Sequence, residues 1–378
     1  IILVQIFIIN KGLIMSYETR KKLYEQIKKE RKNPLIVYVT SIRPNLSSQM
    51  AQDAIPFIIE QIDNIDDSIE EIDFMIISNG GDPITALRIH LLLKERFKKI
   101  NVLIPYVAYS VATIFTLGAD NIIMGQYSNL GPVDPQITSQ RKDSHGVPNN
   151  LQFGSEDLRY FIEFVKNDIG VKKEKNKLKA CEELISNVGG NTIGFAKRSQ
   201  QLSLYLSEKF LSEHKYKKNK IKKIAKKLNS SFHHSYAVSR TEAIEMGLNV
   251  EKPTKNLEKI MWDIWKDFED EMKCKIAFDP ISEVMKNSVV ASKLNNVSVI
   301  SIPANLPPQL QQQAFQTAAS QIKAVTQSSI QISVLLGCIE SIEIGYNINT
   351  TLNVLAWRNF DMSVGINLTP TSEGWNKI

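Results

Sequence analysis

The stretch from Ile72 to Pro83 constrains the fold of this chain more than any other. Residues 72–78 have the apolar pattern of a buried strand, and the turn Asn79-Gly80-Gly81-Asp82-Pro83 that follows opens a helix. Glycine lets the main chain approach another molecule without a Cβ in the way. Unpaired backbone N–H groups at such a turn suit a developing negative charge. We therefore expect a strand-to-helix junction that can stabilise an oxyanion.

Strand and helix signals alternate on both sides of this junction. Strands are predicted at 35–40, 72–78, 101–107 and 121–124, and helices at 47–62, 83–98 and 111–118. Units of this length predict parallel strands joined by right-handed crossovers. The fold class is therefore α/β, and its sites are expected where strands give way to helices.

The rest of the chain divides by composition. Residues 136–151 are polar and predict an exposed loop, 156–268 are mainly helical, 309–326 predict a helix, and 330–375 alternate like antiparallel strands. A composition shift near Pro280 predicts a main domain at 15–280 and a C-terminal α+β module at 281–378. Residues 1–14 precede Met15 and a predicted helix at 17–32, and we interpret them as an upstream or non-native extension.

Charge and cysteine usage favour a cytoplasmic protein. The three cysteines, Cys181, Cys274 and Cys338, fit neither a disulfide framework nor metal spacing, so no metal is expected. The net charge of +6 would permit contact with nucleic acid or anionic lipid. The positive charge is densest at residues 215–227, where lysines alternate with Ile221 and Ile224 and are followed by Leu228, a pattern typical of a helix with a solvated basic face. Without aromatic or arginine clusters a nucleic-acid partner is not expected. The apolar start, 1–9, is too short to span a bilayer.

Five sequence blocks in order carry a family resemblance. They are LIVYVTSIRP, SNGGDP, AYSVAT with LGADNIIMG, SNLGPVDPQ and SFHHSYAVSRTEAIEMGL, between about residues 35 and 250. This succession resembles the serine dehydrogenase proteinase family of the Clp/crotonase superfamily, which includes Clp peptidase and signal peptide peptidase A. The resemblance implies a Clp/crotonase-like fold of repeated β-α units and hydrolysis of peptides without ATP or a cofactor. It also implies assembly into a homo-oligomer.

The resemblance places the nucleophile at Ser110, at a strand-to-helix turn. It implies oxyanion donors at the backbone N–H groups of Val111 and Gly81, with Gly80 beside them. Residues 82–84 would border the substrate, so Asp82 is expected there, with an extended peptide pairing by strand addition.

The general base is less determined. No histidine lies in 130–136, where Clp peptidase would have one, and no lysine lies in 153–157, where signal peptide peptidase A would have one. We expect His234 to deprotonate Ser110 and Asp134 to fix the histidine tautomer. His233 and Lys142 are alternatives.

Structural interpretations compete with these roles. A serine after a strand is often a helix cap, Asp134 before Pro135 can hold a turn, and Gly80 and Gly81 can serve a tight turn alone. At the level of function, a serine peptidase competes with a crotonase-like enzyme that stabilises a thioester enolate in the same oxyanion hole. The third alternative is a catalytically silent scaffold that binds a partner through its C-terminal module.

Overall fold

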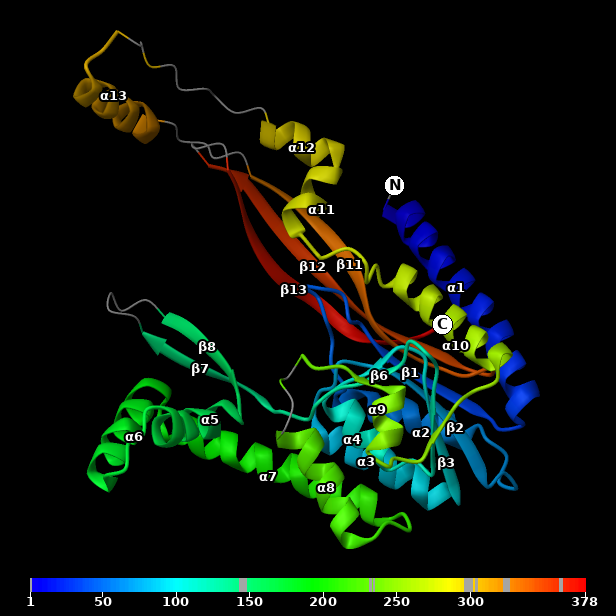
Figure 1. Cartoon of the computed structure of the whole chain (residues 1–378). Helices are drawn as coiled ribbons and strands as arrows, with labels where there is room; N and C mark the ends of the chain where they lie inside the picture. The colour runs from blue at the N-terminus through cyan, green and yellow to red at the C-terminus, as the bar shows by residue number, and fades with distance from the viewer. Residues whose placement is uncertain are drawn as a thin grey trace.

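An eight-stranded sheet runs through the molecule (Figure 1). The computed structural model describes residues 2–142, 148–230, 233, 235–295, 302, 305–321, 327–359 and 363–378. The strand order is β10-β5-β3-β2-β1-β11-β12-β13, in which the first five strands are parallel and β11 to β13 are antiparallel. These strands are β1 (Leu35–Thr40), β2 (Glu71–Ile77), β3 (Lys99–Ile104), β5 (Asn121–Met124), β10 (Val250–Glu251), β11 (Gln327–Glu340), β12 (Gly345–Arg358) and β13 (Val364–Lys377).

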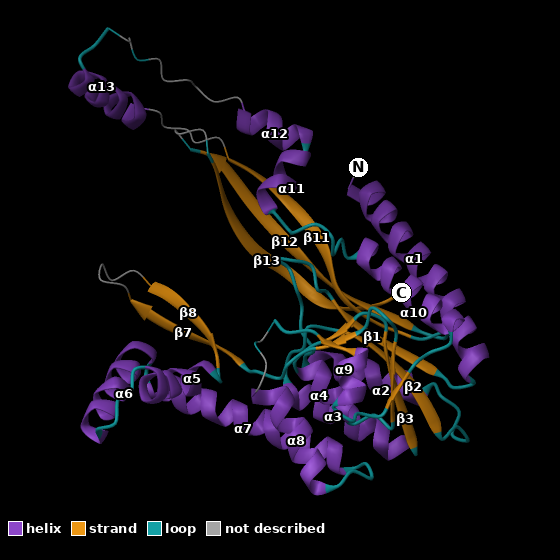
Figure 2. Ribbon diagram, viewed as in Figure 1, coloured by secondary structure: helices purple, strands orange, loops and turns teal. Residues whose placement is uncertain are grey.

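Helices cover both faces of the parallel part of the sheet, as Figure 2 shows. Side chains alternate between the two faces, because successive residues of a strand point in opposite directions. In β2, Phe74 and Ile76 enter the core under α2, α3, α4 and α7, whereas Met75 and Ile77 enter the core under α1 and α10. The helices are α1 (Ile2–Arg31), α2 (Ile55–Asp63), α3 (Pro83–Arg96), α4 (Val111–Leu117), α5 (Asp157–Glu163), α6 (Glu174–Val188), α7 (Gly190–Ser212), α8 (Lys218–Ser230), α9 (Arg240–Glu245), α10 (Lys255–Glu271), α11 (Pro280–Lys286), α12 (Ser288–Asn295) and α13 (Pro308–Gln321).

The predicted α/β organisation with parallel β-α units is confirmed, and two local predictions are wrong. Residues 47–51 do not begin a helix: a short 3-10 turn at Gln52–Ala54 precedes α2, whose first turn contains Pro56. The described residues of the loop predicted at 136–151 form strands instead, since β7 (Gln136–Lys142) pairs antiparallel with β8 (Pro148–Gly154). Short strands β4 (Val107–Ala108), β6 (Asn129–Leu130) and β9 (Val238–Ser239) form a small second sheet.

The residues expected in a C-terminal module continue the central sheet. Strand β11 pairs antiparallel with β1, with Val37 opposite Glu340 and Thr40 opposite Gly337. The buried Arg20 of α1 also holds this strand, because its guanidinium donates to both carboxylate oxygens of Glu340 at 2.9 and 2.6 Å. Helices α11 and α12 pack on the outer half of β11 and β12 and form a separate apolar cluster there.

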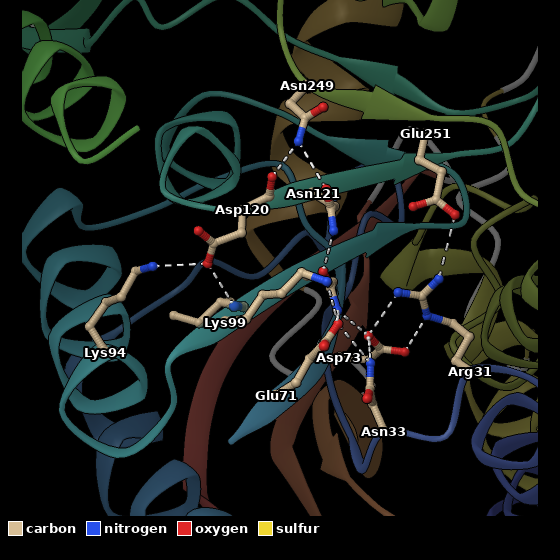
Figure 3. A network of polar contacts seen from close by, with 12 residues as sticks. Arg31, Asn33, Glu71, Asp73, Lys94, Lys99, Asp120, Asn121, Asn249 and Glu251 are labelled. Atoms are coloured by element: carbon tan, nitrogen blue, oxygen red, sulfur yellow. Dashed lines mark hydrogen bonds and ion pairs between the residues drawn. The ribbon is translucent and has the colours of Figure 1, made fainter. Parts of the chain in front are cut away.

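A polar ladder crosses the amino ends of the parallel strands (Figure 3). Asp73 of β2, Asn101 of β3 and Asn121 of β5 lie opposite one another in register. Asp73 is fully buried and accepts hydrogen bonds from Arg31, Asn33 and Asn101. This ladder satisfies the polar groups at one end of the sheet, and the Gly80 turn lies at the other end.

Candidate active site

The backbone at Ser110 turns sharply between β4 and α4. Its dihedral angles are φ 50° and ψ −115°, a conformation that residues with a Cβ rarely adopt. Such a conformation costs on the order of 1–3 kcal/mol and persists only where the surroundings enforce it. Ser110 occupies the N-cap position of α4, yet its side chain makes no cap hydrogen bond. The helix-cap interpretation of Ser110 is therefore not supported, and its hydroxyl is left for another role.

Gly80 packs directly beneath this turn. A Cβ at position 80 would lie 2.8 Å from the Cβ of Ser110 and 3.0 Å from the backbone nitrogen of Val111, and Gly80 has φ +109°. Its own N–H donates to the hydroxyl of Ser78, which in turn accepts from Thr40. Glycine is thus required at position 80 both by the backbone angle and by the close approach of the nucleophile turn.

Two backbone amides remain without a partner beside Ser110. Neither the N–H of Gly81 nor that of Val111 donates a hydrogen bond to a described residue. Both residues line one cavity together with Ser110. Buried or partly buried N–H groups are normally satisfied, so two unused donors next to the half-buried Ser110 are suited to bind an anionic oxygen.

The strand addition expected at residues 82–84 does not fit this structure. Met50 occupies that edge: its N–H donates to Gly80 O at 2.8 Å and its carbonyl accepts from Asp82 N–H at 2.9 Å. The Asp82 carboxylate caps α3 by accepting from the N–H groups of Ile84 and Thr85. Since residues 83–96 are helical, they present no strand edge to a substrate.

The cavity at Ser110 has a volume of about 340 Å³. Its walls come from five parts of the chain: the segment before α2, the Gly80 turn, the Ser110 turn, residues 134–137 and α7. The sequence did not point to the wall residues Gln49, Phe195, Ser199, Leu202 and Ser203, because no motif links α7 or residue 49 to the nucleophile.

Asp134 lies between this cavity and a second one. It lines the Ser110 cavity and also a neighbouring cavity of about 480 Å³ that His233 lines. Its carboxylate accepts from the Ser155 hydroxyl at 3.0 Å, from Glu156 N–H at 3.3 Å and from the Gln136 amide at 3.2 Å. These bonds fix the Asp134 side chain at the base of the β7–β8 hairpin.

The candidate bases are only partly described. His233 is exposed, and its Nδ1 accepts from the N–H of Ser235 at 3.3 Å. His234 lies outside the described residues. Lys142 ends β7, and its side chain also lies outside the description. The structure thus brings Ser110, Gly81, Val111 and Asp134 to one cavity and His233 to the adjacent one.

Thr113 is a positioning residue that the sequence reasoning missed. Its hydroxyl, in the first turn of α4, lies 2.7 Å from the carbonyl oxygen of Ala108 and 2.8 Å from that of Gly131, to either of which it can donate, and it accepts from Gly131 N–H at 3.1 Å. It therefore ties the helix behind Ser110 to the LGPVDPQ block that carries Asp134. A threonine inside a short apolar helix was the only signal for it.

One known protein family matches the part of the chain that contains this site. Residues 53–146 match the family of ClpP-like SDH-type serine proteinases. The match confirms the resemblance for this part of the chain, which contains the Gly80 turn, Ser110 and Asp134, and it supports a Clp-like α/β fold.

Two archaeal proteins are similar in sequence to parts of this chain. Protein MJ1495 of Methanocaldococcus jannaschii is 30% identical over 181 residues, which is 47% of this chain and 51% of the relative. Protein MJ0137 of the same organism is 41% identical over 66 residues, 18% of this chain and 23% of the relative. The chain thus spans about half the length of the first relative and about a quarter of the second.

Solved structures are similar only at low scores. The 1510-N membrane-bound stomatin-specific protease has 15% identity and a TM-score of 0.34, with 60% of this chain and 84% of that chain covered. ClpP1 from Listeria monocytogenes has 13% identity and a TM-score of 0.29, with 62% and 98% covered. At these scores the two structures carry no argument about the site of this chain.

Proposed function

We propose that this chain, which resembles the ClpP-like SDH-type serine proteinases over residues 53–146, is a serine peptidase with Ser110 as its nucleophile. The observation that carries the proposal is the Ser110 turn itself. It combines a positive φ, a side chain that caps no helix, and two unpartnered amides at Gly81 and Val111. A purely structural serine at a helix start needs none of these.

The reaction would proceed through an acyl-enzyme. Ser110 Oγ attacks the carbonyl carbon of the peptide bond while a base takes its proton. The Gly81 and Val111 N–H groups stabilise the oxyanion, each contributing about 3 kcal/mol to the transition state. The base then returns the proton to the leaving amine, and water hydrolyses the ester. No cofactor, nucleotide or metal is required by these steps.

The base we propose is His234, with His233 and Lys142 as the alternatives. The adjacency of the Asp134 carboxylate to both cavities supports a histidine from residues 233–234, since a carboxylate orients the base in such triads. Because Asp134 already accepts hydrogen bonds from the described residues Gln136, Ser155 and Glu156, we propose that it serves as a fixed orienting group.

The substrate would be an unstructured peptide or protein segment, cleaved by a cytoplasmic homo-oligomer. Apart from Asp134, the cavity at Ser110 mixes apolar walls from Ile137, Phe195 and Leu202 with the uncharged polar groups of Gln49, Ser199 and Ser203. Such a lining favours uncharged side chains next to the cleaved bond.

The experiment is cleavage of unfolded casein without nucleotide, with the product peptides identified by mass spectrometry. The parent is expected to cut casein, and Ser110→Ala is expected to lower the rate at least about a thousandfold. Ser199→Ala is the matched control, because Ser199 lines the same cavity from α7 and should keep activity within about threefold.

Two outcomes would overturn the proposal. If Ser110→Ala cuts as fast as the parent, the nucleophile lies elsewhere. If the folded parent cuts nothing and instead accelerates deuterium exchange at the α-carbon of an acyl thioester, the chain is a crotonase-like enzyme.

A further inference from the structure

Positive charge is concentrated on the helical arm, residues 156–230, which contains α5 to α8 (Figure 1). It has eighteen Lys and Arg and nine Asp and Glu residues, a net charge of +9. The whole chain carries +6, so the rest of it carries −3. The basic character of this protein therefore belongs to one structural part.

The strongest part of this charge is a lysine patch on α8 and the turn before it. We define the patch as six exposed residues, Lys215, Lys217, Lys218, Lys222, Lys223 and Lys226. None of their ammonium groups forms an ion pair or hydrogen bond with a described residue. The nearest acidic side chains along the chain are already engaged: Glu213 with His90 and Glu242 with Lys227.

Packing against the core fixes the helix that carries the lysine patch. Ile224, Ala225 and Leu228 bury the opposite side of α8, and the Asn229 amide bonds the Ser207 hydroxyl of α7 at 3.1 Å. Lys218, Lys222 and Lys226 are four residues apart, so they form a row with a rise of about 6 Å per step. The row is presented outward without any rearrangement of the helix.

The composition of the patch distinguishes among anionic partners. It contains no arginine, which would recognise phosphates and bases by paired hydrogen bonds. Its aromatic neighbour Tyr216 has one face of its ring occupied by the Lys220 ammonium at 4.2 Å, and no ladder of aromatic rings accompanies the described lysines of the patch. A row of lysines without stacking groups fits a diffuse anionic surface better than a nucleic acid.

Exposed apolar side chains on the same arm point to the same kind of partner. Ile169 is 58% exposed and precedes Lys172 and Lys173, and Leu178 is 60% exposed between Lys177 and Lys179. Lysines interspersed with exposed aliphatic groups are typical of surfaces that adsorb to the interface of a bilayer. In the described residues no helix is long and apolar enough to cross a membrane.

We propose that the lysine patch docks this protein peripherally onto bilayers rich in anionic lipid. Helix α7 packs against α8 and also forms one wall of the Ser110 cavity through Ser199 and Leu202. Docking would therefore hold that cavity at a fixed distance from the bilayer surface. This inference goes beyond the proposed peptidase activity and does not depend on it.

The test is cosedimentation of the full chain carrying Ser110→Ala with vesicles of phosphatidylcholine containing phosphatidylglycerol as about one third of the lipid. Binding is expected at low salt, and pure phosphatidylcholine vesicles should not sediment the protein. Binding should fall steeply as salt rises from about 50 to about 300 mM, because screening weakens surface charge interactions.

Two triple variants distinguish the effect of the lysine patch on vesicle binding from the effect of net charge. Lys218→Glu/Lys222→Glu/Lys226→Glu is expected to weaken vesicle binding at least about tenfold. The control Lys252→Glu/Lys255→Glu/Lys293→Glu removes the same charge at exposed lysines outside the arm and should retain binding within about threefold. A Lys→Gln triple at the patch should give an intermediate loss, which guards against a folding defect in the Glu variant.

Three results would overturn the proposal. Equal loss in both triple variants would mean that net charge alone drives adsorption. Equal binding to pure phosphatidylcholine vesicles would show that anionic lipid is not what the protein binds. Failure to bind the anionic vesicles, with patch-dependent binding to duplex DNA or RNA at the same salt, would assign the patch to nucleic acid.

Discussion

At the residue scale, the geometry of the candidate site depends on what surrounds Ser110. The turn of Ser110 is accommodated by Gly80 below it and by Thr113, which ties α4 to the Asp134 block. The N–H of Gly80 donates to the Ser78 hydroxyl and its carbonyl accepts from Met50 N–H, whereas the N–H of Gly81 has no described partner. The two adjacent glycines therefore have different tasks, one supporting the turn and the other offering a donor.

Gly80→Ala tests the supporting task. The new Cβ would lie 2.8 Å from Ser110 Cβ and 3.0 Å from Tyr109 O, so the nucleophile turn must shift. A displacement of about 1 Å at the reacting atoms can cost about a hundredfold in rate, so we expect at least that loss in peptide cleavage. Gly374→Ala is the control, because nothing lies within 4 Å of the Cβ added there. Unchanged cleavage by a folded Gly80→Ala would contradict the close packing.

Sequence reasoning located the residues of this site that are local in the chain. The turn of Gly80 and Gly81 could be identified from a strand-turn-helix signal, and the family resemblance placed Ser110 and Val111 beside it. Gln49 and Phe195 could not, because they reach the cavity only through tertiary packing. The course of residues 47–51 was also misjudged, since their extended conformation depends on bonds to Gly80 and Asp82.

At the element scale, the far end of α4 is fixed by α7. The His214 ring, just beyond α7, has its Nε2 at 3.0 Å from the carbonyl of Leu117, the last residue of α4. Burial lowers the pKa of His214, although the Leu117 carbonyl and Asp120 act in the opposite direction. The folded protein thus favours the neutral ring at this contact.

This contact predicts a pH dependence of stability. Because the pKa of His214 is lower in the folded state, its contribution is fully present above the unfolded value of 6.5 and is lost as the pH falls through the folded value. The free energy of unfolding in urea should therefore decline below pH 6.5. In His214→Gln, which keeps an N–H for Leu117, that decline should be smaller; parallel pH profiles would refute the assignment.

The polar ladder of Figure 3 predicts a large effect of one buried carboxylate. Asp73→Ala leaves the guanidinium of Arg31 without its Asp73 acceptor and the amide of Asn101 with Glu71 alone, and we expect a loss of about 3–5 kcal/mol in the free energy of unfolding. Removing the exposed ion pair of Glu70 with Lys98 by Glu70→Ala should cost less than about 1 kcal/mol. Urea denaturation measures both, and similar losses would show that the ladder is not coupled.

At the scale of the whole molecule, the C-terminal strands complete the sheet of the peptidase-like part. Strand β11 covers the edge of β1, and Glu340 is the bidentate partner of the buried Arg20. The composition shift near Pro280 predicted a C-terminal module. The pairing of β11 with β1 could not be predicted, because a sequence pattern shows where strands occur and not which strands they pair with.

A chain ending at Asp279 tests this dependence. It would expose the edge of β1 from Val37 to Thr40 and leave Arg20 buried without Glu340. We expect such a chain to aggregate and to show no cooperative thermal transition, because open apolar edges associate and Arg20 keeps only its Asp267 and Glu271 partners. Size-exclusion chromatography and calorimetry report both properties. A monodisperse, cooperatively folded fragment would instead establish residues 15–279 as an independent domain.

The central claim is that Ser110 is an activated nucleophile. The most direct measurement is to treat the folded parent with a fluorescent serine-reactive phosphonate and to map the adduct by mass spectrometry. The account predicts one adduct, on Ser110, that is absent in Ser110→Ala and persists in Ser199→Ala. An adduct on another serine, or a folded parent that never labels, would contradict it.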